Sequence, residues 1–258
     1  MALGDLHKDA SAVFDHASFA MGATWFGSDL AAVSAALRET PAKGIVLFLT
    51  GSRQRGQDAQ FAEWMPDLSG WLMVAPNTHA LSARPSYTSP AEQSVYAQVH
   101  HLRVAEIEYC LSRLQALPAF ADLPLAIVGL SEGAVAALAW RSENPATRVC
   151  LAWPCETTYF AHLPKLPDDL DTPILNIMGG TDSYFAEQDS LSAQSGTPKG
   201  HGSESLSDYA QAKVILYPNW GHRILDHSFA RGDVMGFLNH HLSPKQKSQG
   251  DNDNDHHG

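Results

Sequence analysis

Long apolar runs are missing from this sequence. No stretch reaches the roughly 18 uninterrupted apolar residues that a membrane span requires. The first residues mix Asp, Lys and His, without the basic start and apolar stretch of a secretory signal. We therefore expect no membrane partner and no export signal.

Cysteine and positive charge are also scarce. Only 3 cysteines are present, an odd and sparse count, so we expect no disulfide framework and a reduced, cytoplasmic location. The sequence has 17 basic and 28 acidic residues, which gives a formal net charge of -11. Because phosphate contacts need clustered Lys and Arg, this balance argues against a nucleic-acid partner.

The rest of the composition is that of a folded globular protein, with 44% hydrophobic and 17% charged residues. A length of 258 residues suits a single α/β domain. We expect one domain over residues 1–243, with an ordered core from about residue 12, and a polar, disordered tail over residues 244–258. The oligomeric state stays open, a homodimer included.

Short β-branched or apolar runs alternate with longer helical patterns along the chain. The runs are nearly continuous in apolar character, which is typical of strands buried on both faces. This alternation predicts the α/β class: a mostly parallel central sheet flanked by helices on both faces. The predicted strands are residues 44–49, 71–75, 125–128, 149–152, 174–178 and 213–217.

Helices are predicted between these runs. A long one covers about residues 92–117, with Arg103 and Glu106 off its apolar stripe, and Pro118 ends it. Small residues after Ser131 predict a closely packed helix that continues until Pro145 ends it. The others are a short helix with Phe61, Trp64, Met65 and Leu68 on one face, and a last one over residues 228–242.

One motif carries chemistry. The segment Gly129–Gly133 reads G-x-S-x-G, directly after a predicted strand and before a predicted helix, which is the context of a nucleophile elbow. Such a turn lifts the hydroxyl of Ser131 above the carboxyl edge of the sheet. It also aims the amide of Glu132, at a helix start, toward a developing oxyanion. The side chain of Glu132 has two possible roles. It either stabilises the helix dipole, or it is held by Arg53, Arg84 or a histidine and shapes the site.

An acid and a histidine follow the serine in the order that this arrangement requires. Asp182 follows the strand ending at Met178, and His222 follows the strand ending at Tyr217. Both lie at carboxyl ends of strands, where open α/β sheets place their sites. His222 is the predicted base and Asp182 the acid that orients it. The competing acids are Asp168, Asp169, Asp171 and Asp189, and the competing histidines are His201, His227, His240 and His241.

These motifs resemble the dienelactone hydrolase-like serine esterase branch of the α/β-hydrolase superfamily. The resemblance runs from about Lys43 to Leu242 and rests on the elbow, on Gly180–Asp182 and on Trp220–His222. It also rests on the lack of a long insertion between Cys150 and Pro173, where many lipases carry a helical cap.

This resemblance implies a small esterase without a large cap domain, acting on soluble substrates. Two features depart from the family pattern. Dienelactone hydrolases proper have cysteine where this chain has Ser131, and the usual His-Gly after the first core strand is here Thr50-Gly51-Ser52. The second oxyanion amide is therefore assigned to Ser52 or Arg53.

Several residues near strand ends are candidates for binding substrate. Arg84 lies in a long loop with His79 and Tyr87; it either clamps a substrate carboxylate or pairs with a local acid. The aromatic residues at other strand ends either line the pocket or seal core edges: Trp153, Tyr184, Phe185 and Trp220. Residues 186–207 form either a flap over the pocket or a disordered segment.

The leading functional prediction is hydrolysis of a small soluble carboxylic ester, thioester or lactone through an acyl-serine intermediate. The alternatives are acyl transfer by the same residues and a non-catalytic binding protein on the hydrolase fold. We expect no cofactor or metal, because the sequence has no phosphate-binding loop, no dinucleotide-binding glycine motif and no paired-histidine metal spacing.

Overall fold

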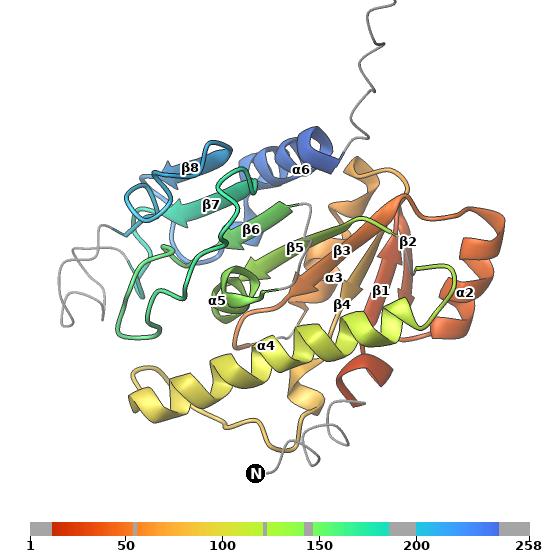
Figure 1. The fold of residues 1–258 in the computed structure, drawn as a ribbon, viewed down its shortest axis with the longest axis horizontal. Helices are drawn as coiled ribbons and strands as arrows, with labels where there is room; N and C mark the ends of the chain where they lie inside the picture. The colour runs from red at the N-terminus through yellow and green to blue at the C-terminus, as the bar shows by residue number, and fades with distance from the viewer. Residues whose placement is uncertain (1–11, 54–55, 121–122, 142–146, 186–199, 243–258) are drawn as a thin grey trace, which may run out of the picture.

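The computed structural model describes residues 12–53, 56–120, 123–141, 147–185 and 200–242. They form an eight-stranded sheet with the order β2-β1-β4-β3-β5-β6-β7-β8 (Figure 1). β1 pairs antiparallel with β2 and with β4, and every other pair is parallel. The strands are β1 (Ser18–Met21), β2 (Thr24–Gly27), β3 (Gly44–Leu49), β4 (Trp71–Ala75), β5 (Leu125–Leu130), β6 (Thr147–Leu151), β7 (Ile174–Gly179) and β8 (Ala212–Tyr217).

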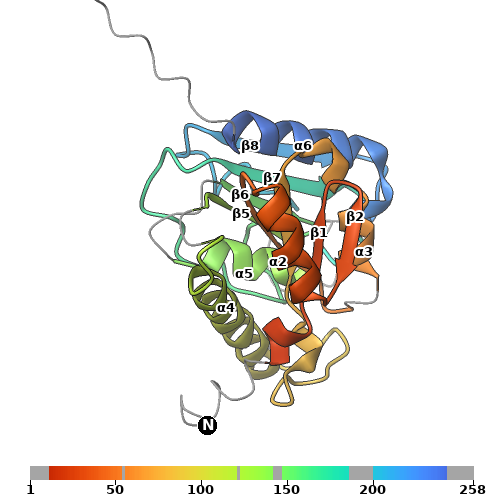
Figure 2. The ribbon, with the colours of Figure 1, turned by 90° about the vertical axis from the view of Figure 1, so that its right-hand side faces the viewer.

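Helices cover both faces of the sheet (Figure 2). One face packs against α2 (Leu30–Glu39), α4 (Gln93–Gln115) and α5 (Glu132–Ala139). The opposite face packs against α3 (Gln57–Ala62) and α6 (Ser228–Leu242), with the short turns η1 (Met65–Asp67) and η4 (Ile224–Asp226) beside them. A third short turn, η2 (Thr78–Ala80), lies in the loop after β4.

The central strands are buried on both faces, which explains why their sequences are continuous apolar runs. All residues of β3 are buried, with Val46 and Phe48 in the cluster under α3 and α6, and Ile45 and Leu47 in the cluster under α4. Alternate side chains of a strand point to opposite faces. Because both faces are covered, both sets must be apolar.

The predicted fold class is confirmed, and all six predicted strands are present. The predicted last helix is α6, and the long predicted helix is α4. The short predicted helix is divided into α3 and η1. No helix in the described part of the chain is long and apolar enough to cross a membrane.

Three elements near the N-terminus were not predicted. β1 and β2 have only four residues each, too short for a clear alternation. α2 did carry a signal: Asp29 accepts a hydrogen bond from the amide of Ala32 at 2.9 Å as its N-cap, and Val33 and Leu37 are its buried residues.

Two expectations for the helices were wrong. α5 ends at Ala139, well before Pro145, because Trp140 takes an extended conformation and buries its side chain against the sheet. Arg103 and Glu106 were expected outside the buried stripe of α4, yet both side chains are buried, because loops and α5 cover that side of the helix. The predicted tail, 244–258, lies outside the described residues, as does most of the predicted flap.

Candidate active site

The carboxyl ends of β3 to β8 lie along one edge of the sheet, because these strands are all parallel. The loops that leave this edge carry most of the residues singled out in the sequence. Ser131 directly follows β5, Asp182 comes three residues after the end of β7, and His222 comes five residues after the end of β8. Parallel pairing thus brings together positions that are far apart in the chain.

Ser131 occupies a strained turn between β5 and α5. Its backbone has φ 53° and ψ -113°, and its amide donates to the carbonyl of Leu151 at 2.7 Å. Few residues other than glycine adopt a positive φ, and such strain recurs at functional sites. The helix can start this close to β3 only because Gly133 has no side chain: a Cβ there would lie 2.2 Å from the carbonyl oxygen of Leu49.

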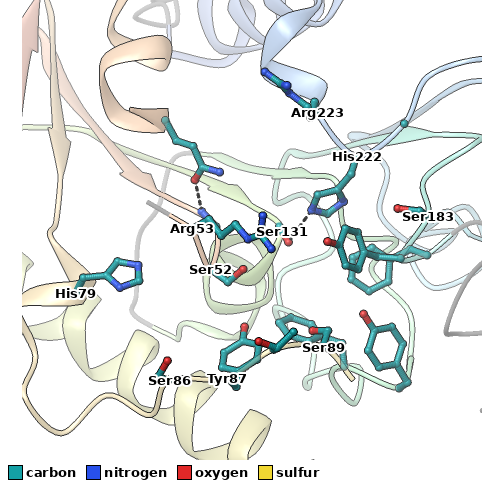
Figure 3. A pocket seen from close by; sticks show the side chains of 18 of the residues that line it. Ser52, Arg53, His79, Ser86, Tyr87, Ser89, Ser131, Ser183, His222 and Arg223 are labelled. Carbon is teal, nitrogen blue, oxygen red and sulfur yellow. Dashed lines mark hydrogen bonds between the residues drawn. The ribbon is translucent and has the colours of Figure 1, made fainter. Parts of the chain in front are cut away.

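A chain of hydrogen bonds joins the serine, the histidine and the acid. The Oγ of Ser131 lies 3.0 Å from Nε2 of His222, and Nδ1 of His222 lies 2.7 Å from Oδ2 of Asp182. Figure 3 shows Ser131 and His222 facing each other across the first of these bonds. Asp182 is fully buried, and its other oxygen accepts from the amide of Tyr184 at 2.8 Å. The acid is therefore held in place on both oxygens.

The loops that carry the acid and the histidine are bonded to each other. The amide of Thr181 donates to the carbonyl of Trp220 at 2.9 Å. This approach needs glycine at the end of β7, because a Cβ on Gly179 would lie 2.3 Å from the same carbonyl oxygen. The glycines beside Asp182 in the sequence thus have a packing role.

The competing acids and histidines lie elsewhere. Asp168 is exposed and pairs with Lys165, and Asp169 and Asp171 precede β7, away from its carboxyl end. Asp189 lies outside the described residues. Among the histidines, His227 stacks on the ring of Trp220 at 3.7 Å, and His240 and His241 lie on α6. His201 lies in the turns before β8.

A cavity of about 970 Å³ opens over Ser131. One part of its wall is aromatic, with Tyr87, Tyr159, Phe160, Tyr184 and Phe185 among the lining residues. The rings of Tyr184 and Phe185 lie 4.8 and 5.9 Å from the imidazole of His222. The other part is polar and includes Arg53, His79 and Arg223 (Figure 3).

The predicted aromatic walls divide into two groups. Tyr184 and Phe185 do line the cavity. Trp153 does not, because it is fully buried in the core beneath. Trp220 stacks between Tyr217 and His227, with ring centroids 3.9 and 3.7 Å apart, so it reinforces the rim without lining the cavity.

Arg84 reaches the cavity, but its guanidinium is already engaged. Its Nη2 donates to Oε2 of Glu132 at 2.9 Å, and the two side chains are 6% and 0% exposed. Of the two hypotheses for Arg84, the structure thus favours pairing with an acid of the protein over binding of a substrate carboxylate. For Glu132 it likewise favours the hypothesis of a side chain that is held by other residues and shapes the site. Arg84 is one of its partners.

Burial and the charge of Arg84 lower the pKa of the neighbouring His79, which is therefore neutral at pH 7. Neutral His79 adds hydrogen-bonding capacity to this side of the cavity without adding charge.

The loop after β3 lies beside the nucleophile. The amide of Gly51 donates to Oε1 of Gln57 at 2.8 Å, so it is already satisfied. Ser52 and Arg53 follow it and line the cavity. Their amides, with that of Glu132 at the start of α5, are the remaining candidates for binding an oxyanion.

Sequence reasoning missed several residues of the site. Gln57 was not singled out, because nothing in its local pattern indicates that it binds the loop after β3. Tyr159 and Phe160 come from the irregular segment after β6, where apolar residues have no period to interpret. Arg103 was expected only to lie off the apolar stripe of α4, yet its guanidinium donates to the carbonyl of Thr50 at 2.8 Å, directly before the loop.

Comparison with known proteins identifies the type of fold. No protein-family model and no curated protein sequence matches this chain. Solved structures do match it. Esterase PE8 is 20% identical with a TM-score of 0.54, over 78% of this chain and 94% of that one.

Two further structures match over 78% of this chain, each at 16% identity. One is a phospholipase/carboxylesterase from Dyadobacter fermentans, with a TM-score of 0.55 over 90% of its length. The other is a protein from Klebsiella pneumoniae provisionally described as a dienelactone hydrolase, with a TM-score of 0.53 over 87% of its length. The chain therefore has the α/β-hydrolase fold, and its structure is similar to those of proteins described as esterases and as a dienelactone hydrolase.

Proposed function

We propose that this chain is a serine hydrolase that cleaves a small carboxylic ester through an acyl-serine intermediate. The observation that carries the proposal is the bonded series of Ser131, His222 and buried Asp182, with separations of 3.0 and 2.7 Å. A serine hydroxyl is a weak nucleophile until a neighbouring base removes its proton. Here the base is within hydrogen-bonding distance and is itself oriented by a carboxylate.

In the first half of the reaction, the hydroxyl of Ser131 gives its proton to Nε2 of His222 as Oγ attacks the ester carbonyl carbon. The carbonyl oxygen becomes an oxyanion, stabilised by the amide of Glu132 and by an amide of Ser52 or Arg53. When this intermediate collapses, the bond to the alcohol oxygen breaks and His222 returns the proton to that oxygen. Asp182 supports the imidazolium in between.

In the second half, water replaces the alcohol. His222 takes a proton from water, whose oxygen attacks the acyl carbon and forms a second tetrahedral intermediate. Its collapse breaks the bond to Oγ and returns the proton to Ser131. The products are the free acid and the regenerated enzyme.

The cavity supports a small-molecule substrate. Its volume of about 970 Å³ is at the upper end of the range typical of small-molecule sites. The aromatic wall beside His222 suits an apolar or planar group on the substrate. That several structural neighbours are called esterases, among them esterase PE8 and the carboxylesterase from Dyadobacter fermentans, adds support for this class.

The experiment that tests the proposal compares the parent with Ser131→Ala. We expect a fluorophosphonate probe to label the parent and not the variant. Turnover of p-nitrophenyl acyl esters should fall by about 10³-fold or more. Running a series of acyl chain lengths, as esters and as thioesters, would also define the preferred substrate.

Ser112→Ala is the matched control. Ser112 lies on α4, and its hydroxyl donates to the backbone of Tyr109, away from the cavity. This variant should label and turn over like the parent. Equal turnover by Ser131→Ala and the parent would end the proposal.

A further inference from the structure

Behind the nucleophile lies a buried group of charged side chains: Arg84, Arg103, Glu106 and Glu132. The last three are 0% exposed and Arg84 is 6% exposed. Burying a charge costs several kcal/mol unless partners compensate it. Neither the attack on the ester nor the proton transfers require this group, so its place beside Ser131 calls for another explanation.

Arg103 contacts two segments that meet at the site. Its Nη2 donates to the carbonyl of Thr50 at 2.8 Å, and its Nε lies 3.7 Å from Oε1 of Glu132. Thr50 directly precedes Gly51–Arg53, and Glu132 directly follows Ser131. One buried guanidinium therefore joins both segments whose amides are candidates for the oxyanion hole.

The peptide unit between Thr50 and Gly51 is fixed from both ends. Arg103 binds its carbonyl at 2.8 Å, and the side chain of Gln57 binds its amide at 2.8 Å. Rotation of this unit would change the direction of the amides that follow, at Ser52 and Arg53. Donors must lie about 2.7–3.1 Å from an oxyanion to stabilise it, so a small rotation matters.

Glu132 connects the same arginine to the cavity wall. Its Oε2 accepts from Arg84 at 2.9 Å and from the hydroxyl of Tyr87 at 2.5 Å, and both of these residues line the cavity. Burial alone would raise the pKa of Glu132, but Arg103, Arg84 and Tyr87 hold it below the ordinary value. The carboxylate of Glu132 thus links α5, α4 and the loop after β4 through Arg103, Arg84 and Tyr87.

We propose that Arg103, held by Glu132, is a positioning residue that sets the geometry of the oxyanion hole. This inference rests on the proposed function, because an oxyanion forms only if Ser131 attacks a carbonyl. Arg103 is not among the residues that line the cavity, and it acts through the backbone of Thr50–Arg53 and the first turn of α5.

The test is Arg103→Lys, which keeps the charge but offers one nitrogen where the guanidinium offers three. We expect kcat for a p-nitrophenyl ester to fall about tenfold to a hundredfold, with KM changed less than about threefold. The Ki of a trifluoromethyl ketone, which adds to Ser131 and forms an oxyanion, should rise by the factor by which kcat/KM falls.

The matched control is Arg148→Lys. Arg148 is also buried and also donates to a backbone carbonyl, that of Ala137 near the far end of α5. Both variants should lose stability in urea, but only Arg103→Lys should lose kcat and affinity for the ketone. If Arg103→Lys does not fold, Glu132→Gln removes the charge that holds Arg103 while keeping an oxygen for Arg84, and it should show the same loss of kcat.

The outcomes separate this inference from the proposed function. A parent that neither reacts with fluorophosphonate nor turns over esters contradicts the function. A parent that does both, with folded Arg103→Lys or Glu132→Gln variants that keep parental kcat and ketone affinity, contradicts only the role of Arg103.

Discussion

At the scale of single residues, the site depends on one serine with a positive φ and on the glycine that makes room for its turn. Ser131 has φ 53°, and the carbonyl of Leu49 lies where a side chain on Gly133 would be. Asp182 and His222 require no such strain, because two loops bonded through Thr181 and Trp220 hold them. Substitutions at these positions separate chemistry from packing.

Asp182→Asn tests the chemistry. The amide keeps the size of the carboxylate but cannot support an imidazolium and favours the wrong tautomer of His222. We expect kcat to fall on the order of 10⁴-fold, with a far-ultraviolet circular dichroism spectrum like that of the parent. A variant that retained most of the parent's turnover of p-nitrophenyl esters would show that Asp182 does not orient the histidine.

Gly133→Ala tests the packing. The new Cβ would lie 2.2 Å from a backbone oxygen of β3, which cannot rotate away as a side chain could. We expect the free energy of unfolding in urea to fall by about 1–3 kcal/mol.

Gly236→Ala on α6 is the control, because its Cβ would meet nothing within 4 Å. That variant should gain about 0.5–1 kcal/mol from helix propensity. Equal stability changes at the two glycines would contradict the packing argument.

At the scale of elements, each helix is held by the stripe of side chains that it buries against the sheet. α6 buries Ala230, Val234 and Leu238 on the face that it shares with α3. It follows directly after η4 and the loop of His222, so its docking fixes the end of that loop. The free energy that holds α6 therefore also supports the site.

Leu238→Ala should be costly. The side chain is 0% exposed, so its truncation leaves a cavity in the core. We expect a loss of about 2–5 kcal/mol in the free energy of unfolding, measured in urea. Phe229→Ala, on the same helix but 71% exposed, should change it by no more than about 0.5 kcal/mol. The reverse order of the two effects would contradict the placement of α6.

At the scale of the whole molecule, stability should depend on pH through Glu106. Burial raises the pKa of this carboxyl to about 7, although Arg103 acts in the opposite direction. The folded chain therefore holds the proton more tightly than the unfolded chain, whose pKa is near 4.5. Its contribution to the free energy of unfolding falls as pH rises between these two values, and it stays low above pH 7.

Glu106→Gln removes this titration. Relative to the parent, we expect the variant to gain stability between pH 5 and pH 8, on the order of 1–3 kcal/mol, from unfolding in urea at both pH values. Glu108→Gln, an exposed position on the same helix, should leave the pH dependence unchanged. A parallel pH profile for parent and Glu106→Gln would contradict the shifted pKa.

The central strands were predictable from the sequence because they are buried on both faces, and burial on both faces leaves a continuous apolar signal. The first two strands lie at one end of the sheet, with β2 at its edge, and four residues each are too few to carry a clear pattern. Asp29, the N-cap of α2, is the local signal from which that helix could have been predicted. The end of α5 was not predictable, because the packing of Trp140 decides it and no local stop signal does.

By itself the sequence determined the class of the fold and the positions of a serine, an acid and a histidine at strand ends, because parallel strands direct their carboxyl ends to one edge. Only the tertiary structure decided which side chains surround them. Arg84 and Arg103 pair with Glu132, and Trp153 lies in the core, because contacts between distant segments depend on how helices and loops pack together. The local sequence pattern indicates which face of a helix or strand is apolar. It does not indicate which residues that face, or the polar side chains beside it, will contact.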